Sequence, residues 1–66
     1  MDLNQAVAAA EAGAKIRDDA TMKPDWTVQF DKETKTLFYH TPNGTKAHKI
    51  IFHDGHRASF QWRIVT

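Results

Sequence analysis

The chain has 66 residues, with 9 Lys and Arg against 8 Asp and Glu, so its net charge at pH 7 is +1 with neutral histidines. This balance argues against a nucleic-acid binder, which needs a basic stripe, and no apolar run approaches the roughly 20 residues that cross a bilayer. The absence of cysteine excludes disulfides and thiolate metal sites. So short a chain buries only about 60% of its unfolded surface, and we expect one domain, residues 1–66, supported by oligomerisation.

The first residues predict a helix over about residues 3–13. Asp2 and Gln5 have the spacing of a capping box, in which each side chain accepts a hydrogen bond from the other residue's amide. Small apolar residues then recur at helical spacing, and most residues between them are alanine, the best helix former. Gly13 suits the left-handed conformation that ends a helix. Because the charge beside Met1 is acidic, we expect no signal peptide and a cytoplasmic protein.

After the helix we expect a short extended exit over residues 15–17 and a loop over 18–25, where Pro24 argues against regular structure. From Trp26 onward apolar and polar residues alternate with period two, which is typical of half-buried strands. The expected fold class is therefore α+β, with an N-terminal helix packed on a four-stranded antiparallel meander sheet between Trp26 and Thr66.

Three turns separate the predicted strands. The first covers residues 31–35, and its loop has three or four residues. Asn43-Gly44 and Asp54-Gly55 each favour a two-residue type I′ turn, because these residue types tolerate positive φ angles. Such turns set the strand register. The predicted pairs are Thr41 with Lys46, Phe38 with Lys49, His53 with His56, Ile51 with Ala58, and Lys49 with Phe60.

In this register both faces of the sheet carry large apolar side chains, and one short helix covers only one face. We therefore predict that oligomerisation or a partner buries the second face, since monomers rarely expose so large an apolar patch; the alternative is a sheet that curls into a small barrel. A four-residue first loop adds Trp26, Val28 and Phe30 to the second face, and a three-residue loop adds them to the first. The predicted interface residues are Leu37, Tyr39, Ile50, Phe52 and Val65.

No segment matches a catalytic signature. Ser59, the only serine, lies in no nucleophile motif, and the carboxylates lie in polar segments, so we predict neither an enzyme nor a bound cofactor. His53 and His56 face each other across the predicted turn, but two ligands are fewer than a structural zinc site needs. We expect no metal site and interpret these histidines as solvated turn residues. The aromatic residues are interpreted as core, with stacking on a nucleotide base as the alternative.

Short motifs near both ends of the chain resemble those of a family of small bacteriophage proteins. In that family a helix is followed by a Gly-Lys-Lys-Ile/Val segment with a nearby arginine and then a tryptophan, and the chain closes on a tryptophan beside Ile or Val. The matching residues here are Gly13, Lys15, Ile16 and Arg17, and then Trp62, Ile64 and Val65. The family includes the Thoeris anti-defence sponges, homo-oligomers that sequester cyclic nucleotide-like signals of bacterial immune systems.

The resemblance implies a phage-encoded homo-oligomer in the host cytoplasm that inhibits a host defence by holding a cyclic nucleotide-like ligand. It implies ligand-binding roles for Lys15 and Arg17, and we predict one for Trp26 as well, because this residue opens the first predicted strand after a loop, where its ring can stack on a base. An arginine holds a phosphate through two parallel hydrogen bonds, and a tryptophan stacks on a base. The alternative is a protein–protein inhibitor or adaptor that docks on a host enzyme through an exposed sheet face or edge.

Overall fold

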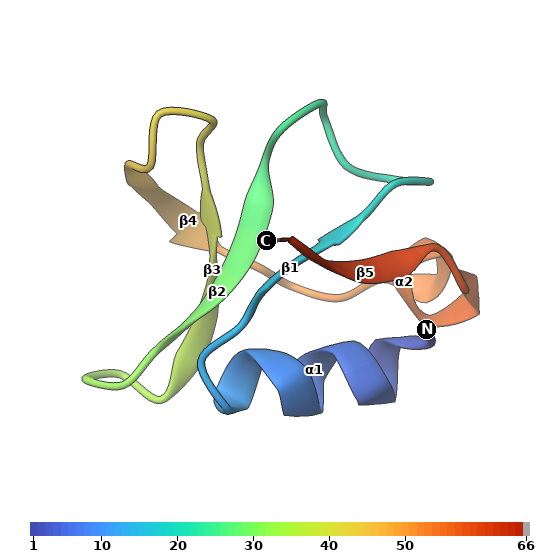
Figure 1. The fold of residues 1–66 in the computed structure, drawn as a ribbon, viewed down its shortest axis with the longest axis horizontal. Helices are drawn as coiled ribbons and strands as arrows, with labels where there is room; N and C mark the ends of the chain where they lie inside the picture. Colours follow the sequence, from blue (N-terminus) through green and yellow to red (C-terminus); the bar gives the residue numbers. More distant parts are fainter. Residues whose placement is uncertain (66) are drawn as a thin grey trace.

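The computed structural model describes residues 1–65, and Thr66, the last residue of the predicted domain, lies outside the described residues. An N-terminal helix packs against an antiparallel sheet, so the predicted α+β class is confirmed. Figure 1 shows α1 running beside the sheet, with α2 close to the N-terminus. The elements are α1 (Leu3–Glu11), β1 (Lys15–Asp18), β2 (Thr27–Asp31), β3 (Thr36–His40), β4 (Lys46–Lys49), α2 (Asp54–Ala58) and β5 (Trp62–Val65).

Helix α1 begins as predicted. The Gln5 amide donates to Asp2 Oδ1 at 2.8 Å, and the Asp2 amide donates to Gln5 Oε1 at 3.0 Å. The helix ends at Glu11, two residues before the predicted end, because Gly13 turns the chain with a φ of +108°. The Gly13 amide then donates to the Ala10 carbonyl at 2.9 Å, which satisfies a free carbonyl of the last turn.

The sheet has five strands, not the predicted four, in the order β4-β3-β2-β1-β5. The additional strand is β1, which includes the segment predicted as an extended exit. It pairs with β2 on one side and with β5 on the other, and Ile16 faces both Val28 and Ile64. Four residues are too few to show a period of two, so the sequence pattern did not reveal a strand whose pairing comes from both neighbours.

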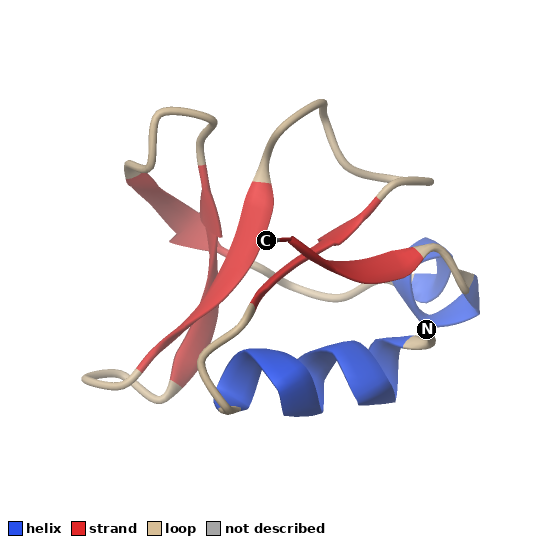
Figure 2. Ribbon diagram, viewed as in Figure 1, coloured by secondary structure: helices blue, strands red, loops and turns tan. Residues whose placement is uncertain are grey.

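The turn predicted at Asp54-Gly55 is wrong, because residues 54–58 form helix α2 (Figure 2). The His53 side chain caps this helix by accepting hydrogen bonds from the Gly55 and His56 amides. This cap stabilises a helical start, which the Asp-Gly pair permits as readily as a hairpin turn. The chain then returns to place β5 beside β1. The predicted strand pairs His53 with His56, Ile51 with Ala58 and Lys49 with Phe60 therefore do not form.

The first turn has the four-residue loop that the sequence left open. Asp31 pairs with Thr36 across it, and Val28 lies opposite Tyr39. At the second turn the two-residue hairpin prediction is wrong: residues 41–45 form a longer loop, in which Gly44 but not Asn43 has a positive φ. A register shift in β3 and β4 accompanies this loop. The observed pairs are Phe38 with Lys49, as predicted, and His40 with Lys46 in place of Thr41 with Lys46.

The core lies between α1 and one face of the sheet. Because Ala6 and Ala10 are small, α1 approaches the strands closely. Trp62 joins Ile50 in the core, because residues 50–61 are not part of a strand and the chain returns to place β5 beside β1. The buried apolar residues are Ala6, Ala10, Ile16, Val28, Ile50 and Trp62, with Leu3, Ala9, Met22, Leu37, Tyr39 and Phe52 packed around them.

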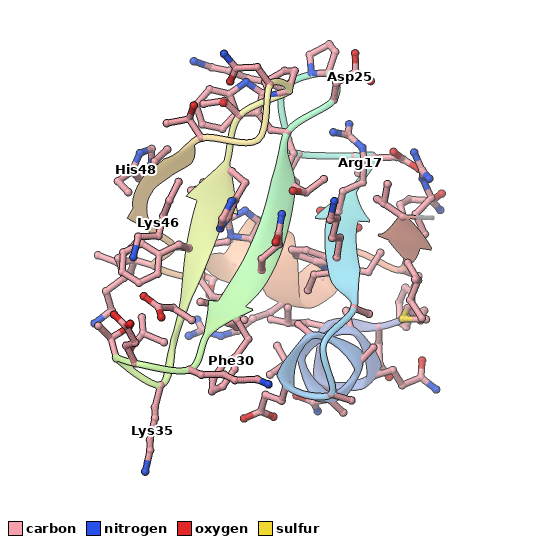
Figure 3. All side chains as sticks on the ribbon, turned by 60° about the vertical axis from the view of Figure 1, so that its left-hand side comes forward. Arg17, Asp25, Phe30, Lys35, Lys46 and His48 are labelled. Carbon is pink, nitrogen blue, oxygen red and sulfur yellow. The ribbon has the colours of Figure 1, made fainter. Side chains whose placement is uncertain are left out.

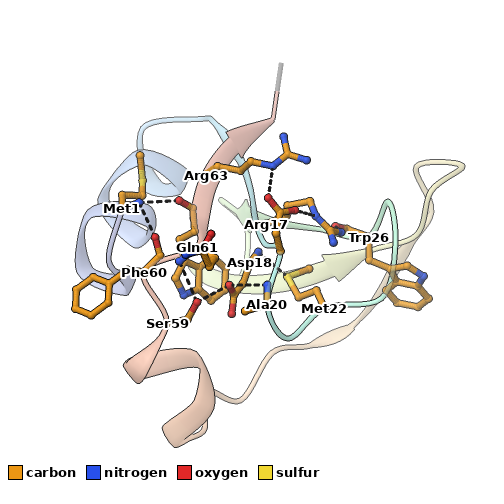
Figure 4. Close-up of polar contacts among 12 residues, drawn as sticks. Met1, Arg17, Asp18, Ala20, Met22, Trp26, Ser59, Phe60, Gln61 and Arg63 are labelled. Atoms are coloured by element: carbon orange, nitrogen blue, oxygen red, sulfur yellow. Dashed lines mark hydrogen bonds and ion pairs between the residues drawn. The ribbon is translucent and has the colours of Figure 1, made fainter.

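A buried carboxylate joins three parts of this fold (Figure 4). Asp18 is 0% exposed, and its Oδ1 accepts hydrogen bonds from the Ser59 hydroxyl at 2.6 Å and the Ala20 amide at 3.2 Å. Its Oδ2 accepts from the Thr21 hydroxyl at 2.6 Å. Burial alone would raise the pKa of Asp18, but the hydrogen bonds from Ser59, Thr21 and Ala20 outweigh it and hold the pKa below its usual value.

We expect Asp18→Ala to lower the free energy of unfolding by about 3 kcal/mol, because it leaves buried donors unpaired. Urea unfolding followed by tryptophan fluorescence at pH 7 measures this loss. Asp54→Ala is the matched control, since the Asp54 side chain is fully exposed, and should change stability little. The pKa of Asp18 in the folded chain lies below the ordinary value of 3.8. The contribution of Asp18 to the free energy of unfolding is therefore present above pH 3.8 and is lost as the pH falls further. A wild-type-like Asp18→Ala protein at pH 7 would contradict this role.

Candidate functional site: an aromatic pocket

A pocket of about 260 Å³ opens between the loop after β1 and the strands β3 and β4. Three of its lining side chains are rings, so we call it the aromatic pocket. Trp26 and Tyr39 supply two rings, and His48 on β4 supplies the third. The lining residues are Thr21, Met22, Lys23, Trp26, Tyr39 and His48.

The loop that forms one wall is held by Arg17, a side chain that points from β1 toward the loop (Figure 3). Arg17 is 8% exposed, and its Nη1 donates to the carbonyl oxygens of Lys23 and Trp26, each at 2.9 Å. Its Nε donates to Asp19 Oδ1 at 2.6 Å. Asp25 bends the loop between the two bound carbonyls with a φ of +64°. The two carbonyl contacts therefore set the backbone that presents Lys23 and Trp26 to the pocket.

The rings meet edge to face rather than in parallel stacks. The centroids of Trp26 and Tyr39 are 6.2 Å apart at 73°, and those of Tyr39 and His48 are 5.0 Å apart at 54°. Lys23 Nζ lies 5.6 Å from the Trp26 centroid, within the range of a cation–π contact. The pocket thus combines aromatic surface with a cation at its rim, which suits a planar ligand that carries negative charge.

Tyr39 links the pocket to helix α2 behind it. Its hydroxyl lies 3.5 Å from His56 Nε2. Burial raises the pKa of Tyr39, so the phenol keeps its proton near neutral pH. Burial also lowers the pKa of His56, the neighbouring His53 lowers it further, and Asp18 opposes the shift. Both groups are therefore neutral at pH 7, and the interior side of the pocket carries no charge from them.

The structure brings two of the three predicted ligand residues together. Trp26 lines the pocket, and Arg17 lies directly behind it. The Arg17 guanidinium is occupied by the loop carbonyls and Asp19, so its role in this structure is to position the loop. Lys15 is exposed at the other end of β1, opposite Val65, and does not line the pocket.

The five predicted interface residues lie mostly inside the domain. Ile50 is 5% exposed, and Leu37, Tyr39 and Phe52 pack against the core. Val65 is half-buried on β5. Burial between copies of the chain stays a prediction, but the large apolar side chains that residues 1–65 leave exposed are others, namely Met1, Ile51, Phe60 and Ile64.

Sequence reasoning did not select Thr21, Lys23 or His48 as site residues. Thr21 and Lys23 come from a loop without a periodic pattern, and they reach the pocket through the contacts of Arg17 and Asp18. The predicted register, in which Phe38 pairs with Lys49 and Thr41 with Lys46, already places His48 opposite Tyr39, and the two rings are in contact in the structure. The one sequence signal for this pocket was the group of aromatic residues on the second face of the predicted sheet.

Comparisons with protein-family models, with curated proteins and with solved structures gave no match. Within residues 1–65, no helix is both long and apolar enough to cross a membrane. In the same described part of the chain, no three His, Asp or Glu side chains are grouped so that they could hold a metal ion. The case for a function rests on the geometry of the aromatic pocket and on the sequence resemblance.

We expect Arg17→Lys to lower the free energy of unfolding by about 1–3 kcal/mol, because a lysine cannot serve both loop carbonyls and Asp19 together. Thermal unfolding followed by circular dichroism measures the loss. Lys15→Ala is the control, since Lys15 is exposed on the same strand, and its melting temperature should stay that of the wild type. An unchanged melting temperature for Arg17→Lys would show that the loop does not depend on this side chain.

Proposed function

We propose that this chain is a non-catalytic binding protein whose aromatic pocket holds a planar, negatively charged small molecule of the nucleotide-derived class. In a phage-encoded protein of the kind that the sequence resembles, holding such a molecule removes a host defence signal. The observation that carries the proposal is the grouping of Trp26, Tyr39 and His48 around one cavity with Lys23 at its rim.

The chemistry of the lining residues supports this ligand class. Stacking of a base on an aromatic side chain contributes about 1–3 kcal/mol and tolerates any base, because every base has a π face. The Lys23 ammonium is a mobile point charge suited to a phosphate. The neutral Tyr39 hydroxyl and the Thr21 hydroxyl add hydrogen-bonding groups that can orient the ligand.

The size of the pocket limits how much of a ligand it can enclose. Its volume of about 260 Å³ falls just below the roughly 300–1,000 Å³ of pockets that bury drug-sized ligands. One ring system fits inside, and the rest of a cyclic nucleotide would extend over the rim. A second copy of the chain would cover that part, in agreement with the homo-oligomer that the resemblance implies.

A protein–protein inhibitor is the second candidate function. It is favoured by the exposed apolar side chains near β5, the outer strand of the sheet. Phe60 is 72% exposed and Ile64 43% exposed, and Ile51 in the segment before α2 is 81% exposed. An edge strand with apolar neighbours is a common place for another chain to add a strand.

The test of the small-molecule role uses cyclic dinucleotides, cyclic ADP-ribose isomers and AMP in isothermal titration calorimetry. Wild-type protein should bind at least one of them. Trp26→Ala should weaken binding by about 5- to 150-fold, the loss of one stack, and Trp26→Phe and Lys23→Gln should weaken it as well, through a smaller ring and the loss of one charged contact. Phe60→Ala is the matched control, because it removes an exposed aromatic ring outside the pocket, and should bind as the wild type does.

Two results would count against the small-molecule role. One is a wild-type protein that binds none of these compounds. The other is equal binding by wild type, Trp26→Phe and Lys23→Gln, which would place the ligand elsewhere. The first result together with a protein partner that is lost in Phe60→Ala would favour the protein–protein inhibitor.

A further inference from the structure

Helix α2 is capped by two histidines that serve each other. His53 Nδ1 accepts hydrogen bonds from the amides of Gly55 at 3.0 Å and His56 at 3.4 Å. In return His56 Nδ1 accepts from the His53 amide at 3.2 Å. The two rings stack with their centroids 3.7 Å apart and their planes at 25°. Capping boxes are usually made by Ser or Thr with Glu or Gln, which do not change charge near neutral pH.

This arrangement requires both imidazoles to be neutral. An Nδ1 atom that accepts a hydrogen bond carries no proton, so each ring holds its proton on Nε2. Protonation of either ring puts a hydrogen on Nδ1. This N–H then faces the backbone amide that donates to Nδ1 in the neutral state, so the hydrogen bond breaks and the cap is lost. Protonation of both rings also brings two positive charges together in the stack.

The surroundings of His56 set the pH at which the cap is lost. His56 is buried and packs beside the rings of Phe52 and Trp62. Burial and then the His53 ring lower the pKa of His56, while the Asp18 carboxylate on β1 opposes them. The other titratable groups on elements near α2 are Tyr39 on β3, Asp2 before α1, and Asp54 and Arg57 on α2 itself.

Two chains of contacts connect α2 with the aromatic pocket. The first is the His56 Nε2 to Tyr39 hydroxyl contact of 3.5 Å, and Tyr39 lines the pocket. The second runs through Asp18, whose carboxylate accepts from Ser59, the residue after α2, and from Thr21 in the pocket wall. Trp62 adds a direct link to α2, since its indole nitrogen donates to the His56 carbonyl at 3.0 Å.

We propose that the stacked His53–His56 pair is a proton-sensitive switch that opens helix α2 in mild acid and loosens the Tyr39 and Thr21 walls of the aromatic pocket. The release of a bound ligand rests on the proposed function above, whereas the opening of α2 does not. A nucleotide-class ligand is therefore held at neutral pH and released when protonation breaks the His53–His56 cap.

The direction of the pH effect follows from linkage. Because the His56 pKa is lower in the folded chain, the unfolded chain binds its proton first, and stability falls as pH drops below about 6.5. Three carboxyl groups, those of Asp18, Asp19 and Asp31, also have lowered pKa values. Their contributions to stability are therefore lost only below pH 3.8, the ordinary pKa of an aspartate. Measurements between pH 7.5 and 5 therefore report on the histidines and not on these carboxylates.

The test is a pH titration of the full chain by ¹H–¹⁵N NMR from pH 7.5 to 5, with urea unfolding at both ends. The Trp62 indole signal reports α2, and the Trp26 signal reports the pocket through its contact with Tyr39. In the wild type both signals should move with one midpoint below about pH 6.5. The unfolding equilibrium constant should rise as the pH falls over this range.

The double variant H53N/H56Q replaces the histidine box with a non-titrating one, since Asn is a good N-cap and Gln at the fourth position completes the box. It should fold and lose both the signal movements and the rise in the unfolding constant. H53N alone keeps a cap that does not titrate and should show a reduced response. H40Q is the matched control, because His40 lies on β3 outside the stacked His53–His56 pair, and should respond as the wild type does.

A wild-type protein with no movement of the Trp62 signal, or a double variant that titrates like the wild type, would overturn the switch. Movement of the Trp62 signal without the Trp26 signal would overturn the connection to the pocket. These results are independent of any ligand. An absence of binding to cyclic dinucleotides, cyclic ADP-ribose isomers and AMP at pH 7.5 would instead count against the pocket's proposed function and leave the spectroscopic result standing.

Discussion

The hydrogen bonds accepted by the buried Asp18 carboxylate are the interaction on which the rest of this small domain depends. It joins strand β1, the loop that carries the pocket residue Thr21, and the segment after α2 that contains Ser59. A carboxylate without partners at 0% exposure would destabilise the fold strongly. Two of its donors, Ala20 and Thr21, come from the adjoining loop and the third, Ser59, from a segment distant in the sequence. The charge is tolerated only when all three are in place, and it therefore makes the positions of these segments interdependent.

Strand β1 supports the pocket through its two buried polar side chains. Asp18 holds Thr21 and Ser59, while Arg17 holds the carbonyls of Lys23 and Trp26. A chain of 66 residues has room for few buried apolar side chains, and hydrogen bonds to charged groups replace part of that packing. The aromatic rings then come from two different sources, a loop held by Arg17 and the neighbouring strands β3 and β4. A pocket built on these contacts is sensitive to their loss, which is why the histidine cap of α2 can act on it.

Local signals predicted the elements that depend on nearest neighbours. The capping box of Asp2 and Gln5 marks the start of α1, and the four-residue loop option placed Val28 opposite Tyr39 correctly. The hairpin turn predicted at Asp54-Gly55 did not form, because the His53 side chain caps a helix there instead. The sequence alone does not indicate whether the His53 Nδ1 atom will cap a helix or face solvent in a turn. The fifth strand was missed because Ile16 is held by pairing on both sides rather than by its own pattern. Of the candidate site, Trp26 was selected from the sequence, whereas Thr21 and Lys23 lie in a loop whose path depends on the contacts of Asp18 and Arg17.

The sequence by itself determined the α+β class, the start of α1 and the β2–β3 hairpin, because helix capping and alternation act between residues a few positions apart. Only the tertiary structure decided that β5 returns to β1, that Arg17 is a support of the loop, and that His56 contacts Tyr39. These contacts join residues far apart in the chain, and their free energy comes from burial and from hydrogen bonds that form only after the chain has packed. No local propensity encodes them, so the pocket and its link to α2 become visible only in the folded molecule.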